Sequence, residues 1–156
     1  IVREEVGRTE ITVTGNTEGI EKNEDDTIEC STWAEVEEIV GSDILEPINI
    51  PEGYVLQSLV VQDSNLRKVV TGRYESEKGF FLRIRINVYK KDFSKDMIQY
   101  DKDWSKIDEK EKGGKVEYYY CDNLFEAFFF EKNCVYYVLN NENINVLKLV
   151  VEGMLE

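Results

Sequence analysis

The stretch that decides the fold is Leu82-Arg83-Ile84-Arg85-Ile86-Asn87-Val88-Tyr89. Apolar residues alternate here with charged or polar ones at every second position. A period of two places the apolar side chains on one face of a β-strand and the polar ones on the other. The pattern therefore predicts an antiparallel sheet with one face against a hydrophobic core.

Five further segments on either side of this stretch carry strand patterns. They are residues 55–62, 67–74, 115–121, 124–131 and 134–139. Asp122-Asn123 and Lys132-Asn133 separate the last three segments and predict two hairpin turns. Residues 10–15 alternate and are β-branched, which makes them one possible additional strand. The charged stretch 90–112, which carries Trp104, is interpreted as a loop.

Two amphipathic helices are predicted, one before these strands and one after them. Thr32 and Glu35 have the spacing of a capping box, and the helix that they start has a stop signal at Gly41. The second helix covers residues 143–155, with Asn141 or Asn143 as its N-cap. The fold class is therefore α+β: a mostly antiparallel, curved sheet of five to seven strands with a short helix on its N-terminal side and a C-terminal amphipathic helix.

The charge is unevenly distributed along the 156 residues, whose formal net charge is −13. Residues 1–62 hold 15 acidic and 3 basic side chains, whereas residues 63–156 hold 17 and 16. We therefore divide the chain into an acidic leader, 1–30, and a single α+β domain, 31–156. Nucleic acid and anionic membranes are unfavourable partners because both repel a net anion. No stretch approaches the roughly 18 apolar residues of a membrane-spanning helix.

Residues 45–54 read Leu-Glu-Pro-Ile-Asn-Ile-Pro-Glu-Gly-Tyr and follow the short helix that contains Trp33. Together with the alternating strands and the closing helix, this run resembles a bacterial family catalogued as domain of unknown function 4367. The resemblance covers about residues 31–156 and implies a domain outside the membrane of a Gram-positive bacterium. Such domains often follow a transmembrane helix in anti-sigma-factor-like proteins. The start at Ile1 fits a chain from which a signal or anchor was removed.

No pattern of catalytic or metal-binding residues stands out. The chain has no histidine, and Cys30, Cys121 and Cys134 lack the spacing of a zinc site. We expect these cysteines to be buried or half-buried; Cys121 and Cys134 would be too far apart for a disulfide, so any bridge would involve Cys30. Asp101-x-Asp103-x-Ser105 imitates a calcium loop but lacks its glycine and its final glutamate. The sequence favours a protein that is not an enzyme and holds no cofactor or metal; a hydrolase with an Asp/Glu pair is the minor alternative.

Aromatic residues occupy both faces of the three strands predicted between 115 and 139. One face belongs to the core, and the second is either covered by the leader or by the stretch around Trp104, or is exposed as a binding surface. The candidate surface consists of Tyr119, Phe129 and Tyr137, flanked by Arg83 and Arg85. These two arginines, with Arg73, either pair with Glu75, Glu117 or the leader, or bind the carboxylates of a partner.

The sequence and the resemblance together predict a non-catalytic, extracytoplasmic domain for sensing or protein interaction. Its partner would be an unknown protein or peptide, and the parent protein would be membrane-anchored or secreted. The alternative is a carrier that holds a lipid or another apolar ligand inside a curved half-barrel. A carrier would need roughly 300 Å³ or more of largely apolar volume.

Overall fold

The structure is a computed structural model of the whole chain. It describes residues 2–6, 9–13, 26–41, 44–90, 98–100, 104–111 and 115–156, of which 2–6, 9–13 and 98–100 are described by their backbone only. The motif Asp101-x-Asp103-x-Ser105 therefore lies largely outside the described residues.

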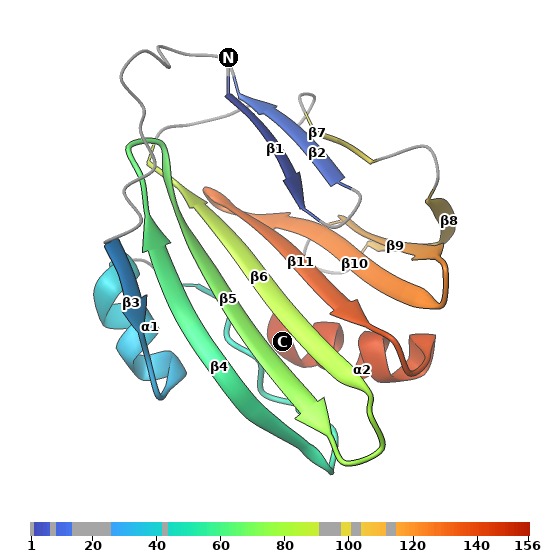
Figure 1. Cartoon of the computed structure of the whole chain (residues 1–156). Helices are drawn as coiled ribbons and strands as arrows, with labels where there is room; N and C mark the ends of the chain where they lie inside the picture. Colours follow the sequence, from blue (N-terminus) through green and yellow to red (C-terminus); the bar gives the residue numbers. More distant parts are fainter. Residues whose placement is uncertain are drawn as a thin grey trace.

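Eight strands form one antiparallel sheet in the order β3-β4-β5-β6-β11-β10-β9-β8 (Figure 1). Their bounds are β3 (Thr27–Glu29), β4 (Tyr54–Asp63), β5 (Arg67–Ser76), β6 (Phe81–Tyr89), β8 (Ser105–Glu111), β9 (Lys115–Cys121), β10 (Leu124–Glu131) and β11 (Cys134–Asn140). A separate three-stranded sheet has the order β1-β2-β7, with β1 (Val2–Val6), β2 (Thr9–Val13) and β7 (Ile98–Tyr100). The predicted α+β class is confirmed.

The predicted number of five to seven strands is wrong, because the large sheet alone has eight. Its two unpredicted strands, β3 and β8, are the edges of the sheet and are almost wholly exposed. An edge strand exposed on both faces needs no alternation of apolar residues, so its sequence looks like a loop. Since β3 pairs with β4, the end of the segment interpreted as a leader belongs to the large sheet. β2 overlaps the strand considered at 10–15.

Both predicted helices are present, and their capping follows the sequence. Helix α1 (Trp33–Val40) begins after Thr32, whose side chain accepts a hydrogen bond from the backbone N–H of Glu35 at 3.3 Å. Gly41 ends it in the left-handed conformation that glycine adopts without strain. Helix α2 (Ile144–Leu155) begins after Asn143, one of the two expected N-caps.

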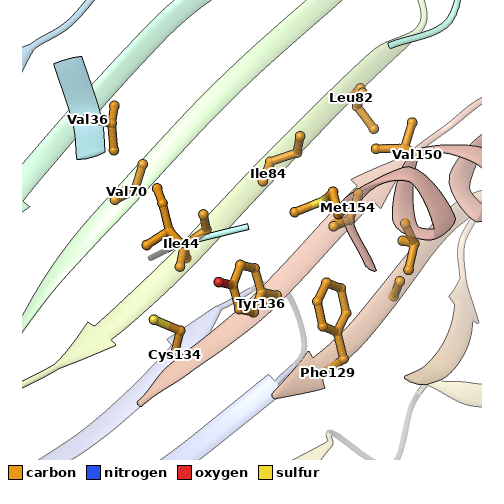
Figure 2. Packing of buried hydrophobic residues seen from close by; sticks show 14 of the residues in the cluster. Val36, Ile44, Val70, Leu82, Ile84, Phe129, Cys134, Tyr136, Val150 and Met154 are labelled. Atoms are coloured by element: carbon orange, nitrogen blue, oxygen red, sulfur yellow. The ribbon is translucent and has the colours of Figure 1, made fainter. Parts of the chain in front are cut away.

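The two helices lie on the same face of the large sheet, which we call the helix-covered face; the opposite side is the outer face (Figure 1). Figure 2 shows the core between them, where Val36 of α1 and Val150 and Met154 of α2 face apolar side chains of the sheet. Phe129 and Tyr136 stack there with ring centroids 4.7 Å apart. Short helices such as these are stable only when packed in this way.

The segment 44–53, which carries the family-like run, also packs on the helix-covered face. Ile44 is buried in the core, and the backbone N–H of Leu45 donates to the hydroxyl of Tyr136 at 2.9 Å. Asn49 approaches α2 so closely that a Cβ atom at Gly153 would lie 2.6 Å from its Nδ2 atom. Gly153 is therefore required by packing and not by backbone conformation.

This close approach gives the first prediction. In an ordinary helix interior, Gly→Ala stabilises a protein by about 1 kcal/mol. Here we expect Gly153→Ala to lower the free energy of unfolding by about 1–3 kcal/mol, because the new methyl group must displace Asn49. Urea denaturation measures the change.

The double variant Asn49→Ala/Gly153→Ala is the control. It removes Nδ2 and Cγ, the two atoms nearest to the new methyl group, and should recover part of the loss. A Gly153→Ala protein that is more stable than the parent would contradict the described packing of residues 44–53 on α2.

Candidate functional site

The register of the two C-terminal hairpins decides which candidate residues meet. Asp122 and Asn123 both have positive φ, 49° and 66°, as a tight two-residue hairpin turn requires. Residues directly opposite each other in an antiparallel pair share a face. Tyr137 lies opposite Phe128 on one side and Arg85 on the other. The outer face thus carries four of the five candidate residues: Tyr119, Tyr137, Arg83 and Arg85.

Phe129 does not belong to this group, so its assignment to the same surface as Tyr119 and Tyr137 is wrong. It lies opposite Tyr136 on β11 and Val116 on β9. All three side chains are buried in the helix-covered core. Its neighbour Phe128 takes its place on the outer face.

The centre of the outer face is buried and aromatic. Tyr89, Phe128, Val135 and Tyr137 form a second apolar cluster, separate from the helix-covered core. The ring centroids of Phe128 and Tyr137 are 5.4 Å apart, and Trp104 is also buried. The second aromatic face is therefore covered at Tyr137 and Phe128, and these two residues form no exposed binding surface.

A charged pair adjoins this cluster. The guanidinium of Arg83 lies 3.6 Å from the carboxylate of Glu126, whose side chain is completely buried while that of Arg83 is 24% exposed. Leu139 lies between them, opposite Arg83 on one side and Glu126 on the other. A buried carboxylate is costly without a cation, so Arg83 compensates Glu126.

Glu126 is not among the partners that the sequence predicts for the arginines. The expected partners of the arginines included Glu75, which does pair with Arg73 at 3.5 Å. The sequence does contain a signal for Glu126. The predicted turn at Lys132-Asn133 fixes which residues of the two flanking strands lie opposite each other, and this pairing places Glu126 opposite Leu139. A lone carboxylate within the apolar run Leu124–Phe130 also needs a cation.

The arginines form a short row on neighbouring strands. Arg73 on β5 lies opposite Arg83 on β6, and Arg85 lies opposite Thr71. The guanidinium of Arg73 lies 4.5 Å from the centre of the Phe81 ring, within cation–π distance. Its side chain is 41% exposed, so this end of the row reaches the solvent.

Tyr119 lies at the other side of the outer face. Its hydroxyl donates a hydrogen bond to Glu117 at 3.1 Å, and Glu117 also forms an ion pair with Lys106 at 2.6 Å. Burial, and next the negative charge of Glu117, raise the pKa of Tyr119 to about 12. Tyr119 is therefore a neutral donor that is already engaged within the protein.

No described group of three or more cysteine or carboxylate side chains has an arrangement that would hold a metal ion. Neither α1 nor α2, the helices of the described ranges, has the length and apolarity to cross a membrane. None of the three cysteines, all of which are described, is in a disulfide; Cys134 is buried and the other two are half-buried, as expected.

Comparison of the chain with protein-family models, with curated proteins and with solved structures found no match. The resemblance to the domain of unknown function 4367 family therefore stays a prediction.

The pair of Arg83 and Glu126 gives the second prediction. Glu126→Gln keeps the size of the side chain but leaves the half-buried Arg83 without this counter-charge. Removing one partner of a fully buried pair costs about 3–5 kcal/mol. Because Arg83 is partly solvated, we expect a loss of about 2 kcal/mol in the free energy of unfolding, measured by urea denaturation.

Glu75→Gln is the matched control, because Glu75 pairs with the more exposed Arg73 and is itself 49% exposed. Glu75→Gln should lower the free energy of unfolding by less than about 1 kcal/mol. Equal effects of the two substitutions would contradict the assignment of Glu126 as the buried partner of Arg83.

The tyrosines give the third prediction. Burial, followed by the hydrogen bond to Glu142, raises the pKa of Tyr54 to about 12, the same value as for Tyr119. The unfolded chain releases these protons near pH 10. The stability that these two tyrosines contribute should therefore be fully present below pH 10. The free energy of unfolding should then fall between pH 10 and 12, by up to about 1.4 kcal/mol per pH unit for each tyrosine.

Denaturation at pH 8, 10, 11 and 11.5 measures this fall. In Tyr119→Phe the free energy of unfolding should fall less steeply between pH 10 and 12, because the variant lacks one of the two hydroxyl groups whose pKa is raised by folding. An unchanged slope would show that Tyr119 ionises equally easily in the folded and unfolded chain, against its described burial.

Proposed function

We propose that this chain is a non-catalytic, extracytoplasmic sensing or protein-interaction domain of a membrane-anchored or secreted Gram-positive protein, similar to the anti-sigma class. The resemblance of residues 45–54 to the domain of unknown function 4367 family supports the extracytoplasmic part of this proposal. Segment 44–53, which contains most of that run, packs on the core, so its residues have a structural role that a related domain would share.

The observation that carries the proposal is the filling of the helix-covered face under α2. Leu147, Val150 and Val151 of α2 are completely buried against the sheet, and Ile44 occupies the space beside Tyr136. A carrier of apolar ligands would need that space for its cargo. The packing therefore favours a domain that binds at its surface over the lipid carrier.

The row of arginines on the outer face is the surface that we assign to the interaction. Arg73 reaches the solvent, and Arg85 lies half-buried beside it on the next strand. A guanidinium can match both oxygens of a carboxylate. Glu75 engages Arg73 through one oxygen only, since its Oε1 atom lies 3.5 Å from both Nε and Nη2. The favoured partner is a protein or peptide segment with exposed carboxylates, which would replace Glu75 at Arg73.

The test, our fourth prediction, uses photo-crosslinking on the surface of Gram-positive cells. The domain is anchored outside the membrane with a photoreactive residue at position Thr71, next to Arg85 in the register. We expect one discrete crosslinked partner, and at least a fivefold loss of it in Arg73→Glu and in Arg85→Gln.

Lys78→Glu is the matched control for Arg73→Glu, because it reverses an exposed positive charge in the turn between β5 and β6. It should leave the crosslink intact. A crosslink equally weak in Lys78→Glu, or no crosslink at all, would contradict the assigned surface. A lipid found in the purified domain by native mass spectrometry would favour the carrier instead.

A further inference from the structure

A pocket of about 290 Å³ lies at one end of the helix-covered face. Its floor is one row of the sheet, because Lys68, Val88 and Cys134 lie opposite one another on β5, β6 and β11. No residue of α2 lines it. The complete lining is Val40, Lys68, Val88, Tyr89, Lys90, Lys132, Asn133 and Cys134.

Three of these eight lining residues are lysines and none is acidic. This concentration of positive charge is unusual in a chain with a net charge of −13. The three lysines come from β5, from the position directly after β6 and from the turn before β11, so only the folded sheet brings them together. Asp63 pairs with Lys90 at 2.7 Å, so the charge at the pocket is net positive and not of one sign. A net positive pocket raises the local concentration of anions.

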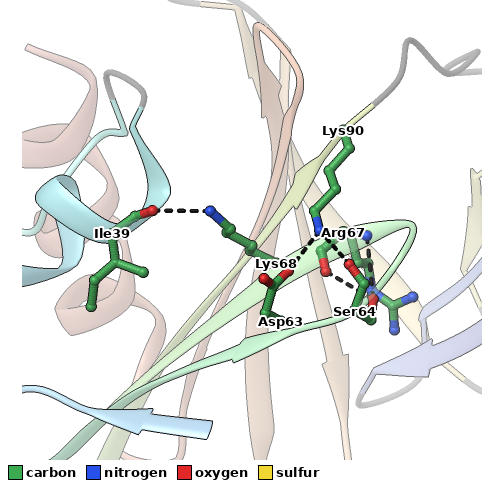
Figure 3. Close-up of polar contacts among 6 residues, drawn as sticks. All are labelled: Ile39, Asp63, Ser64, Arg67, Lys68 and Lys90. Carbon is green, nitrogen blue, oxygen red and sulfur yellow. Dashed lines mark hydrogen bonds and ion pairs between the residues drawn. The ribbon is translucent and has the colours of Figure 1, made fainter. Parts of the chain in front are cut away.

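Two of the ammonium groups are held in place by hydrogen bonds that use only part of their donors (Figure 3). Lys68 donates to the carbonyl oxygen of Ile39 in the last turn of α1, at 3.0 Å. Lys90 donates to Asp63 at 2.7 Å and to the carbonyl oxygen of Ser64. An ammonium has three N–H donors, so Lys68 and Lys90 each keep at least one donor for a ligand.

Besides the lysines, Tyr89 and Asn133, the lining is apolar. Val40, Val88 and Cys134 are buried side chains without charge, and the thiol of Cys134 is kept protonated because burial raises its pKa. The pocket thus combines positively charged donors with an apolar wall. Its volume lies at the lower end of the roughly 300–1,000 Å³ of ligand pockets, which restricts the ligand to a compact molecule.

We propose that this pocket binds a small organic phosphate, with the phosphate group at the lysines and a compact apolar group against Val40 and Val88. Lysines act as separate point charges, which suit a dianion with three equivalent oxygens better than a single planar carboxylate. This inference goes beyond the proposed interaction on the outer face and does not depend on it.

The test titrates the intact chain with phenyl phosphate and follows backbone amide signals by NMR. We expect saturable shifts confined to Val88, Asn133, Cys134 and their neighbours. Binding should weaken with added salt. Phenol and benzoate, which lack the dianionic group, should bind at least about tenfold more weakly.

Lys68→Gln and Lys132→Gln should each weaken the binding about tenfold, whereas Lys78→Gln removes the same charge outside the pocket and should not change it. Two pocket variants are used so that a folding defect in one leaves the other as the test. Shifts that do not saturate, or an equal effect of Lys78→Gln, would overturn the proposal. Arg73→Glu should bind phenyl phosphate normally, which separates this test from that of the outer face.

Discussion

The structure depends on the register of β11. This strand is buried along its whole length and lies between β6 and β10, so it joins the two halves of the eight-stranded sheet. Its alternate residues enter different environments: Tyr136 and Val138 lie in the helix-covered core, whereas Val135 and Tyr137 lie in the cluster on the outer face. A slip by one residue would exchange these sets and remove both clusters at once.

The same register separates the two surfaces that we assign to binding. On the outer face it brings Arg83 and Glu126 to the two sides of Leu139. On the helix-covered face it puts Cys134 opposite Val88, which forms the floor of the lysine-lined pocket. The filled part of that face, under α2, supports the sheet, and the lysine-lined pocket lies at its far end. The two binding proposals thus concern opposite faces and can succeed or fail independently.

Much of the fold could be predicted from the sequence, because its central strands alternate and its helices carry caps. Local residues alone predict the two hairpin turns and the helix start at Thr32. They narrow the start of the second helix to Asn141 or Asn143, of which the structure has Asn143. The edge strands β3 and β8 could not be recognised, since exposed strands carry no pattern that the core imposes. The assignment of Phe129 failed for a different reason: alternation was applied along each strand without the pairing that a two-residue turn dictates. Glu131 and Cys134 flank the predicted turn, and counting back from them puts Phe129 opposite Tyr136.

The candidate site was predictable only in part. Arginine and aromatic residues on alternating strands indicated a shared face, and four of the five do share it. Their burial depends on what the rest of the chain places over them, which a strand pattern does not contain. The pocket was not predictable at all, because Lys68, Lys90 and Lys132 are distant in sequence and meet only through the order β5-β6-β11.

The most direct test of this account is a NOESY spectrum of the folded chain with assigned aromatic rings. The register predicts contacts between the rings of Phe129 and Tyr136, and between those of Phe128 and Tyr137. Contacts of Phe129 with Tyr137, or of Phe128 with Tyr136, in place of these pairs would show a shifted β11. That result would contradict the division into two faces on which the assigned binding surfaces depend.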